Sequence, residues 1–142
     1  MKYSKTKHGY EGLLIVVEGT DGAGKSTQIP IVKNALVQWK GDAYLDKLRI
    51  KTIIEREISE STLQTDRPNQ ELVLKYALQR LKLQSFIENN IENIILSDRS
   101  YISSLAYQGM SDNYDWINEV NRKMCIPDLI VFFKTKITIK TK

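Results

Sequence analysis

The chain has 142 residues, a formal net charge of +4 at pH 7 and a single cysteine. This length suits one domain with a hydrophobic core. A single cysteine excludes an internal disulfide, and we expect Cys125 to be a buried structural thiol. Four lysines in residues 134–142 account for the net positive charge, so the composition excludes a basic nucleic-acid-binding face on the folded part. No apolar run reaches membrane-spanning length, which excludes a membrane span.

The first residues form a polar arm, 1–10, that lacks the apolar stretch of a signal peptide. This predicts a cytoplasmic protein. The first element is the apolar run at 13–17, which is rich in β-branched residues. Such a run is typical of a strand buried on both faces of a parallel sheet.

A phosphate-binding motif follows this strand. Residues 19–26, Gly-Thr-Asp-Gly-Ala-Gly-Lys-Ser, fit the pattern Gly-x-x-x-x-Gly-Lys-[Ser/Thr]. Glycines let backbone N–H groups approach phosphate oxygens, Lys25 can reach the β- and γ-phosphates, and the Ser26 hydroxyl can hold Mg²⁺. The helix predicted to begin here directs its positive end at the anion. We therefore expect a nucleotide-phosphate site.

Helices and strands alternate through the rest of the chain, which predicts an α/β fold with a doubly wound parallel sheet and helices on both faces. The long helix carries an apolar stripe at Leu72, Val73, Tyr76, Leu83 and Phe86. The expected elements are a helix at 26–39 with Pro30 near its first turn, an ambiguous loop at 43–49, a strand at 49–55, a polar loop at 59–69, a helix at 70–90 capped by Asn69, a strand at 93–97, helices at 100–109 and 115–124, and a strand at 129–133.

A second motif begins where the strand at 93–97 ends. Asp98 follows an apolar run, a pattern typical of the second metal-coordinating residue of phosphate-loop phosphotransferases, and Arg99 next to it could bridge two phosphates. The alternative is that Asp98 caps the next helix while Arg99 forms a surface ion pair.

These motifs together resemble the thymidylate kinase family. Its Asp-Arg-Tyr/His-x-x-Ser-x-x-Ala-Tyr-Gln-Gly segment matches residues 98–109, with Ser100 in place of the aromatic residue or histidine. Its loop, Glu-Gly-x-Asp-Gly-x-Gly-Lys-Ser-Thr-Gln, matches residues 18–28, and its Pro-Asp-Leu matches residues 127–129. The family's helix with an aromatic residue and an arginine four positions later matches Tyr76 and Arg80. The resemblance spans roughly residues 12–133.

The resemblance implies transfer of the γ-phosphate of ATP to dTMP, with Mg²⁺ as cofactor. It implies catalytic roles for Lys25, Asp98 and Arg99, and a metal site at Ser26 and Asp98. The residues implied to bind ATP are Gly19, Thr20, Asp21, Gly22, Ala23, Gly24, Lys25, Ser26 and Thr27.

The same resemblance assigns the acceptor site. Asp21 would bond the deoxyribose 3′-OH, Tyr76 would stack on thymine, and Arg80 would reach the base edge. Arg99 would bind the acceptor phosphate and Tyr107 would crowd the ribose 2′ position. Ser104 and Gln108 would face the base, and Arg56, which is followed by Ile58 where the family has proline, would meet the acceptor phosphate.

The chain also departs from the family near its end. The family's lid and adenine loop have no match, and Lys134 replaces its usual aspartate, so we expect a C-terminally truncated core at 1–133 with a Lys/Thr/Ile-rich tail at 134–142. Two alternatives therefore stay open: a nucleotide-binding protein with little or no turnover, and a related deoxynucleoside or nucleoside monophosphate kinase. The expected partners are small nucleotides, and the chain could form a homodimer.

Overall fold

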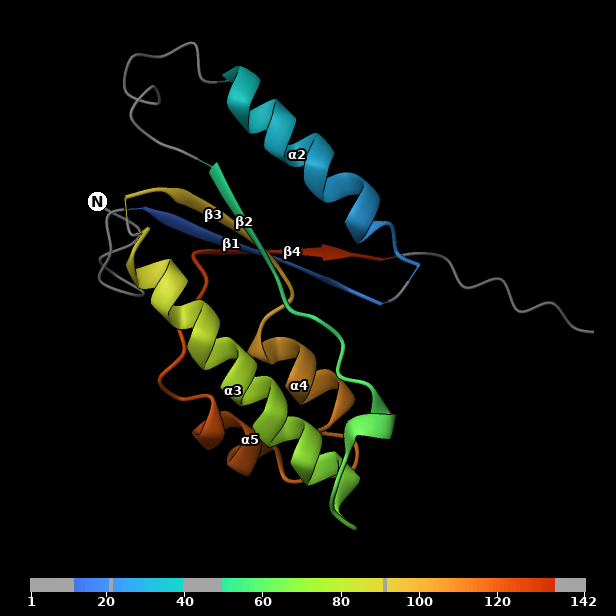
Figure 1. The fold of residues 1–142 in the computed structure, drawn as a ribbon. Coiled ribbons are helices and arrows are strands. Elements are labelled where there is room, and N and C mark those ends of the chain that lie inside the picture. Colours follow the sequence, from blue (N-terminus) through green and yellow to red (C-terminus); the bar gives the residue numbers. More distant parts are fainter. Residues whose placement is uncertain (1–11, 21, 40–49, 91, 135–142) are drawn as a thin grey trace, which may run out of the picture.

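Apolar runs form a parallel sheet at the centre of the computed structural model, which describes residues 12–20, 22–39, 50–90 and 92–134. The strands are β1 (Leu13–Gly19), β2 (Ile50–Ile54), β3 (Ile94–Asp98) and β4 (Leu129–Phe133), in the order β2-β3-β1-β4 (Figure 1). All neighbouring strands are parallel. The central strands β1 and β3 are buried along most of their length, as expected for strands covered on both faces.

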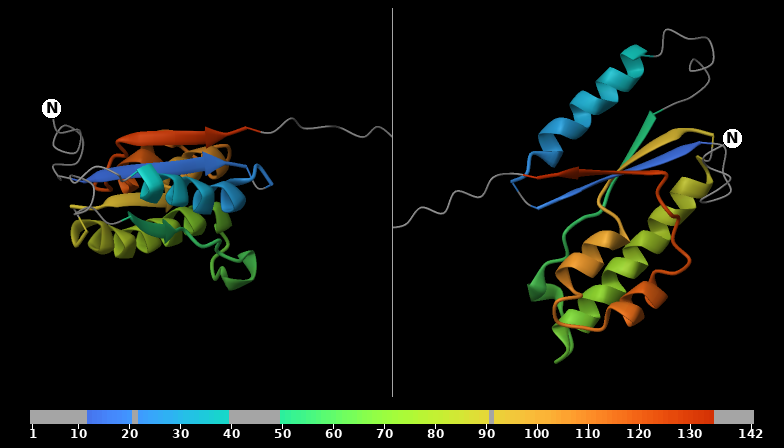
Figure 2. Two further views of the ribbon diagram at one scale, coloured as in Figure 1. Left: turned by 90° about the horizontal axis from the view of Figure 1, so that it is seen from above. Right: turned by 180° about the vertical axis from the view of Figure 1, so that it is seen from behind.

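Helices cover both faces of this sheet, because parallel neighbours require crossover connections. Helix α2 (Lys25–Trp39) lies on one face, and α3 (Pro68–Glu88), α4 (Tyr101–Tyr107) and α5 (Tyr114–Val120) lie on the other, as Figure 1 and the view from behind in Figure 2 show. A short 3₁₀ turn, η2 (Glu60–Thr62), interrupts the loop between β2 and α3. The predicted doubly wound α/β sheet is thus confirmed. None of the described helices is both long and apolar enough to cross a membrane.

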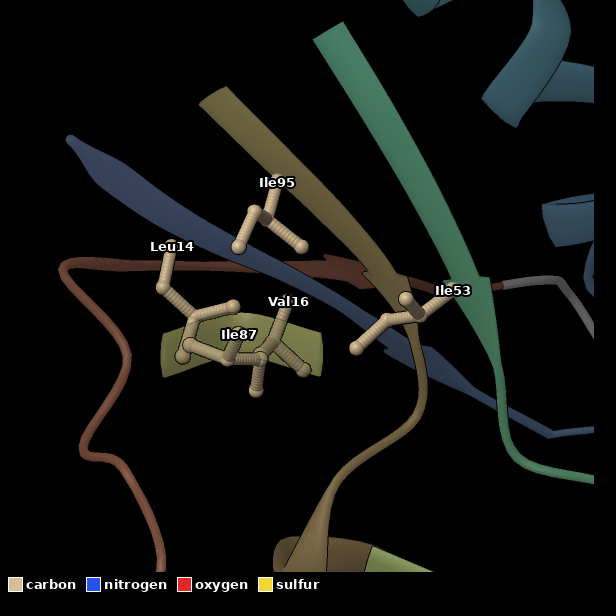
Figure 3. Packing of buried hydrophobic residues seen from close by; sticks show 5 residues of the cluster. All are labelled: Leu14, Val16, Ile53, Ile87 and Ile95. Carbon is tan, nitrogen blue, oxygen red and sulfur yellow. The ribbon is translucent and has the colours of Figure 1, made fainter. Parts of the chain in front are cut away.

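The core lies between the sheet and α3. Leu14 and Val16 of β1, Ile53 of β2, Ile95 of β3 and Ile87 of α3 form one buried cluster (Figure 3). Cys125 packs against this cluster but is half-buried, so the predicted thiol is less enclosed than expected.

The start of α3 corrects one prediction. The sequence predicts a helix from residue 70 with Asn69 as its cap, but the helix begins two residues earlier, at Pro68, with Arg67 in the cap position. Proline suits the first helical position because its fixed φ is already helical and its missing N–H would have had no partner there. The Asn69 side chain instead donates a 3.0 Å hydrogen bond to the carbonyl of Gln108.

The buried face of α3 also differs from the predicted stripe. Phe86 is 37% exposed, whereas Ile87 beside it is buried. The buried positions on this helix are Val73, Ala77, Arg80 and Ile87. The rotation of the helix about its axis therefore places a charged residue, Arg80, among the buried ones and turns Phe86 outward.

Pro30 lies inside α2 in its second turn, and the helix continues through it.

The register of the parallel strands determines where the candidate site lies. Asp98 of β3 is paired with Val17 of β1 on one side and with Ile54 of β2 on the other. The carboxyl ends of these three strands therefore meet at one edge of the sheet, which is where open α/β sheets bind ligands. The predicted arm at 1–10, the loop at 43–49 and residues 135–142 of the predicted tail lie outside the described residues.

Candidate active site

The turn between β1 and α2 has the backbone that its glycines predict. Gly22 and Gly24 have φ of 79° and 93°, values that residues with a side chain rarely adopt. A Cβ on Gly19 would lie 2.7 Å from the carbonyl oxygen of Phe133. Helix α2 then begins at Lys25, which brings its unpaired first-turn N–H groups to the loop. Asp21 lies outside the described residues.

Lys25 and Asp98 join this loop to the end of β3. Nζ of Lys25 lies 3.7 Å from Oδ1 of Asp98, and both side chains are largely buried. Oδ1 accepts no hydrogen bond from the residues that the structure describes, so Lys25 is the cation that faces it. Helix α4 is capped by Ser100, whose side chain accepts a hydrogen bond from the amide of Ile102. The alternative in which Asp98 is that cap is therefore wrong.

These oxygens suit Mg²⁺. The Ser26 hydroxyl and the Asp98 carboxylate line the same cleft, and Mg²⁺ prefers such hard oxygen ligands. Across the described parts of the chain no group of three or more His, Cys, Asp or Glu side chains could enclose a metal.

Arg99, the residue after Asp98, has an unusual backbone. Its φ is 73°, in the left-handed region that favours glycine. Its Nη1 donates to Oγ of Ser103 at 3.2 Å, and its guanidinium carbon lies 5.3 Å from the centre of the Tyr107 ring. This contact is a cation–π arrangement, and it places the guanidinium beside Tyr107 in the wall of the cleft.

Arg80 is buried in a network of side chains from four elements. Its Nη2 donates to Oε2 of Glu55 at 3.0 Å, and its Nε donates to the other oxygen of the same carboxylate. Its Nη1 donates to Oγ of Ser104 at 2.8 Å and to Oδ1 of Asn121 at 3.1 Å. A guanidinium has five N–H groups, so this network uses four of them. Burial raises the pKa of Glu55, and the hydrogen bonds and charge of Arg80 act in the opposite direction.

Tyr76, one helical turn before Arg80, also has a fixed partner. The backbone amide of Ile58 donates to its hydroxyl oxygen at 3.1 Å. Proline, which the family has at this position, lacks that amide, so Ile58 supplies a bond that proline could not make. The backbone amide of Arg56 donates to Oε1 of Gln79, and Nε2 of Gln79 donates to the carbonyl of Arg56. Hydrogen bonds at Arg56 and Ile58 thus attach the loop after β2 to α3.

One cleft of about 520 Å³ brings most of the predicted site residues together. The predicted residues of the described chain that do not line it are Arg56 and, in the phosphate loop, Gly19, Thr20, Gly22, Ala23, Gly24 and Thr27. The predicted residues that line the cleft are Lys25, Ser26, Tyr76, Arg80, Asp98, Arg99, Ser104, Tyr107 and Gln108.

Sequence reasoning missed three residues of this site. Glu55, Asn121 and Ser103 hold Arg80 or Arg99 by the hydrogen bonds described above. Glu55 directly follows a strand, and an acidic residue at such a position is a signal that could have been used. Asn121 carries no comparable signal, because it reaches Arg80 across 41 positions of sequence.

Comparison with known proteins points to one family. The family model described as thymidylate kinase matches residues 17–142. The chain is similar to a probable thymidylate kinase of Methanobrevibacter smithii, with 37% identity over 84% of this chain and 62% of the relative. It is similar to a thymidylate kinase of Francisella philomiragia, with 34% identity over 83% of this chain and 64% of the relative. The chain thus spans less than two thirds of the length of both relatives.

The fold is also similar to that of a solved thymidylate kinase. The crystal structure of the enzyme from Ehrlichia chaffeensis aligns with a TM-score of 0.72 at 22% identity, over 88% of this chain and 77% of that one. At this identity the likeness shows the fold, whereas the family model covers most of the sequence. Because that model extends from within β1 through β4, the chain belongs to the thymidylate kinase family.

Proposed function

We propose that this chain transfers the γ-phosphate of ATP to dTMP, giving dTDP and ADP. One observation carries the proposal: a single cleft contains the phosphate-loop residues Lys25 and Ser26 and also the aromatic–arginine pair Tyr76 and Arg80. A phosphate donor and a nucleoside acceptor could therefore occupy one continuous space, which in-line transfer requires.

The phosphate chemistry needs no general base, since the acceptor's 5′-phosphate is already anionic at neutral pH. Catalysis then consists of positioning and of stabilising charge on the transferred group. Lys25 supplies charge at the donor phosphates, and Arg99 binds the acceptor phosphate. Ser26 and Asp98 would hold Mg²⁺, which neutralises phosphate charge when bound.

The base is held by Tyr76 and Arg80. The ring of Tyr76 stacks on thymine, and Arg80 offers the base edge the single N–H that its network leaves. Ser104 and Gln108, both buried in the wall of the cleft, face the base. Tyr107 lies beside the ribose and favours deoxy substrates. The contacts of residues 19–24 with ATP and of Asp21 with the 3′-OH complete the proposal, and the Arg56 contact stays a prediction.

Binding of both nucleotides with slow turnover is the second candidate. Lys25, Arg80 and Arg99 are the basic side chains that line the described cleft, and Arg80 is already paired with Glu55. An arginine that meets the charge of the transferred phosphoryl group is worth roughly 10³–10⁵ in rate. Three basic side chains of the described cleft would thus share this charge, and each of them already contacts neighbouring side chains.

The wider setting of the protein also belongs to this proposal. A cytoplasmic location agrees with the single cysteine, which suits a reducing compartment. We propose small nucleotides as the partners, with neither nucleic acid nor membrane among them. A homodimer stays a prediction that sedimentation would test.

The experiment has two parts. Calorimetry with dTMP, its ribose counterpart, AMP and ATP should show binding of dTMP and ATP, with dTMP preferred over the ribose form and over AMP. A coupled assay for ADP should then show release that requires dTMP. Failure to bind dTMP would contradict the proposal, whereas binding without ADP release would select the second candidate. A preference for another nucleoside or nucleotide would indicate a related kinase.

A further inference from the structure

Glu18, near the end of β1, holds the beginning of α4. Its side chain is 4% exposed. The amide and the hydroxyl of Ser100 both donate to its Oε1 at 2.9 Å, and the hydroxyl of Ser103 donates to its Oε2 at 2.7 Å. One buried carboxylate thus receives three hydrogen bonds from the first turn of α4 and from its cap.

Arg99 lies directly before this anchored turn, in the left-handed backbone described above. A non-glycine residue in that region costs about 1–2 kcal/mol. Its amide donates to the carbonyl of Val17 at 2.9 Å, and its carbonyl accepts from the Ser97 hydroxyl at 2.7 Å. Strained backbone of this kind persists only where the surroundings over-determine it. Glu18 adds the constraint on the following residue, through the amide of Ser100.

The Ser103 hydroxyl connects the same carboxylate to the guanidinium of Arg99. A hydroxyl has one hydrogen to donate, and in Ser103 this hydrogen goes to Glu18. The oxygen of Ser103 is then left as an acceptor for Nη1 of Arg99, at 3.2 Å. Glu18 therefore acts on both the backbone and the side chain of Arg99.

We propose that Glu18 is the positioning residue for Arg99, and that it turns the guanidinium toward the 5′-phosphate of the acceptor nucleotide. The inference rests on the proposed function, in which Arg99 binds that phosphate. It requires no contact between Glu18 and any ligand. Loss of Glu18 or Ser103 should therefore affect recognition of the phosphate and leave recognition of the nucleoside intact.

The test compares dTMP with thymidine, which lacks the phosphate, by calorimetry on the full chain. Ser103→Ala should weaken dTMP binding about fivefold to tenfold and change thymidine binding less than twofold. Glu18→Gln should weaken dTMP binding at least as much. In an Arg99→Ala background neither substitution should have a further effect. Ser104→Ala is the matched control, because this neighbouring buried serine bonds Arg80 and should weaken dTMP and thymidine by the same factor.

An equal loss for both ligands in Ser103→Ala, no loss for dTMP, or additivity with Arg99→Ala would overturn the inference. If Glu18→Gln does not fold, Ser103→Ala decides. A ligand-free readout separates this inference from the proposed function. The NMR signal of the Arg99 Nε–H should be sharp in the native chain and broadened in Ser103→Ala. An unchanged signal overturns the positioning role, whereas a native chain that binds neither ligand overturns the proposed function and the phosphate role with it.

Discussion

The two ends of the cleft are built in different ways. At the phosphate end, Lys25 begins α2 after the loop that follows β1, Asp98 is the last residue of β3 and Arg99 comes next. The pairing of the two strands brings these residues together. At the base end, Arg80 of α3 is held by Glu55 after β2 and by Asn121 after α5. The phosphate loop depends on backbone geometry, and Arg99 beside it is held by contacts with the neighbouring β1 strand and the first turn of α4. The base end depends on side chains that meet only after three helices have packed.

This difference determines where each end is vulnerable. Backbone hydrogen bonds and glycine conformations hold the phosphate loop, so removal of a side chain there should affect chemistry more than folding. Buried charges hold the base end, and a buried charge that loses its partner destabilises the whole domain.

Glu55→Ala should have the largest effect. It leaves the guanidinium of Arg80, which is 5% exposed, without its carboxylate partner. Breaking a buried pair by removing one partner costs about 3–5 kcal/mol. We expect the free energy of unfolding, measured by urea denaturation, to fall by about that amount.

The double variant Glu55→Leu with Arg80→Leu is the control for this prediction. Replacing both partners by apolar groups removes the pair and the orphaned charge together, which is often nearly neutral. The double variant should therefore recover part of the lost stability, since Ser104 and Asn121 still lose the donor that Arg80 supplies. A double variant as unstable as the sum of the single changes would show that the pair is not coupled.

Lys25→Ala should have the next largest effect, and chiefly on rate. Lys25 faces Asp98, and in the proposed function it also meets the donor phosphates. Removing a donor that stabilises transition-state charge costs about 10²–10³ in turnover. Steady-state ADP release measures this, and calorimetry should show weaker binding of MgATP. Lys33→Ala is the control, since this lysine lies in the same helix but does not line the cleft. An equal loss of turnover in both variants would contradict the assignment of the loop.

The contrast also explains how much of the site could be predicted from sequence. The phosphate loop was predictable because its glycines, Lys25 and Ser26 lie within one stretch, residues 19–26, and their spacing follows from the backbone they need. Tyr76 and Arg80 were placed on one helical face by their spacing of four residues. Their partners Ile58, Glu55 and Asn121 were not predictable, because the phase of α3 and the packing of α5 determine which side chains meet.

The same limit applies to the fold. Each strand in the described part of the chain was predicted, since runs such as those at 13–17 and 129–133 are apolar enough to be recognised alone. The beginning of α3 was misplaced because Asn69 and Pro68 are both start signals for a helix, and with proline at its first position the helix begins two residues earlier than predicted. Local signals of similar strength can be ranked only once the neighbouring chain is in place.

Glycine and alanine variants of Arg99 and Arg80 should differ in stability in opposite directions, because the two arginines have different backbone conformations. Arg99→Gly and Arg99→Ala both remove the guanidinium, but glycine tolerates a φ of 73° and alanine does not. The glycine variant should therefore be more stable than the alanine variant by about 1 kcal/mol in urea denaturation. Arg80, inside helix α3, should show the reverse order, because glycine is about 1 kcal/mol less favourable than alanine in a helix. The same order at both positions would contradict the strain at Arg99.

The smallest effect concerns the loop that borders the base end. The carboxylate of Glu71, in the first turn of α3, pairs with Lys75 at 2.9 Å and accepts from the amides of Gln64 and Thr65. The hydrogen bond from Lys75, with those amides, lowers the pKa of Glu71 from 4.5 to about 2. A carboxyl whose pKa is lower in the folded state stabilises the fold above its unfolded pKa. That contribution should be complete above about pH 4.5 and lost as the pH falls toward 2.

Glu71→Gln tests this, because the variant cannot titrate. The native chain should have the higher melting temperature at pH 6, and the difference between the two proteins should shrink steadily between pH 4.5 and 2. Glu88→Gln removes a charge from the last turn of the same helix and serves as the control for a general effect of charge. A difference that stays constant over this range would show that the Glu71 contacts do not depend on ionisation. The attachment of the loop to α3 would then rest on Gln79 and Tyr76, whose hydrogen bonds to the Arg56 and Ile58 backbone carry no charge.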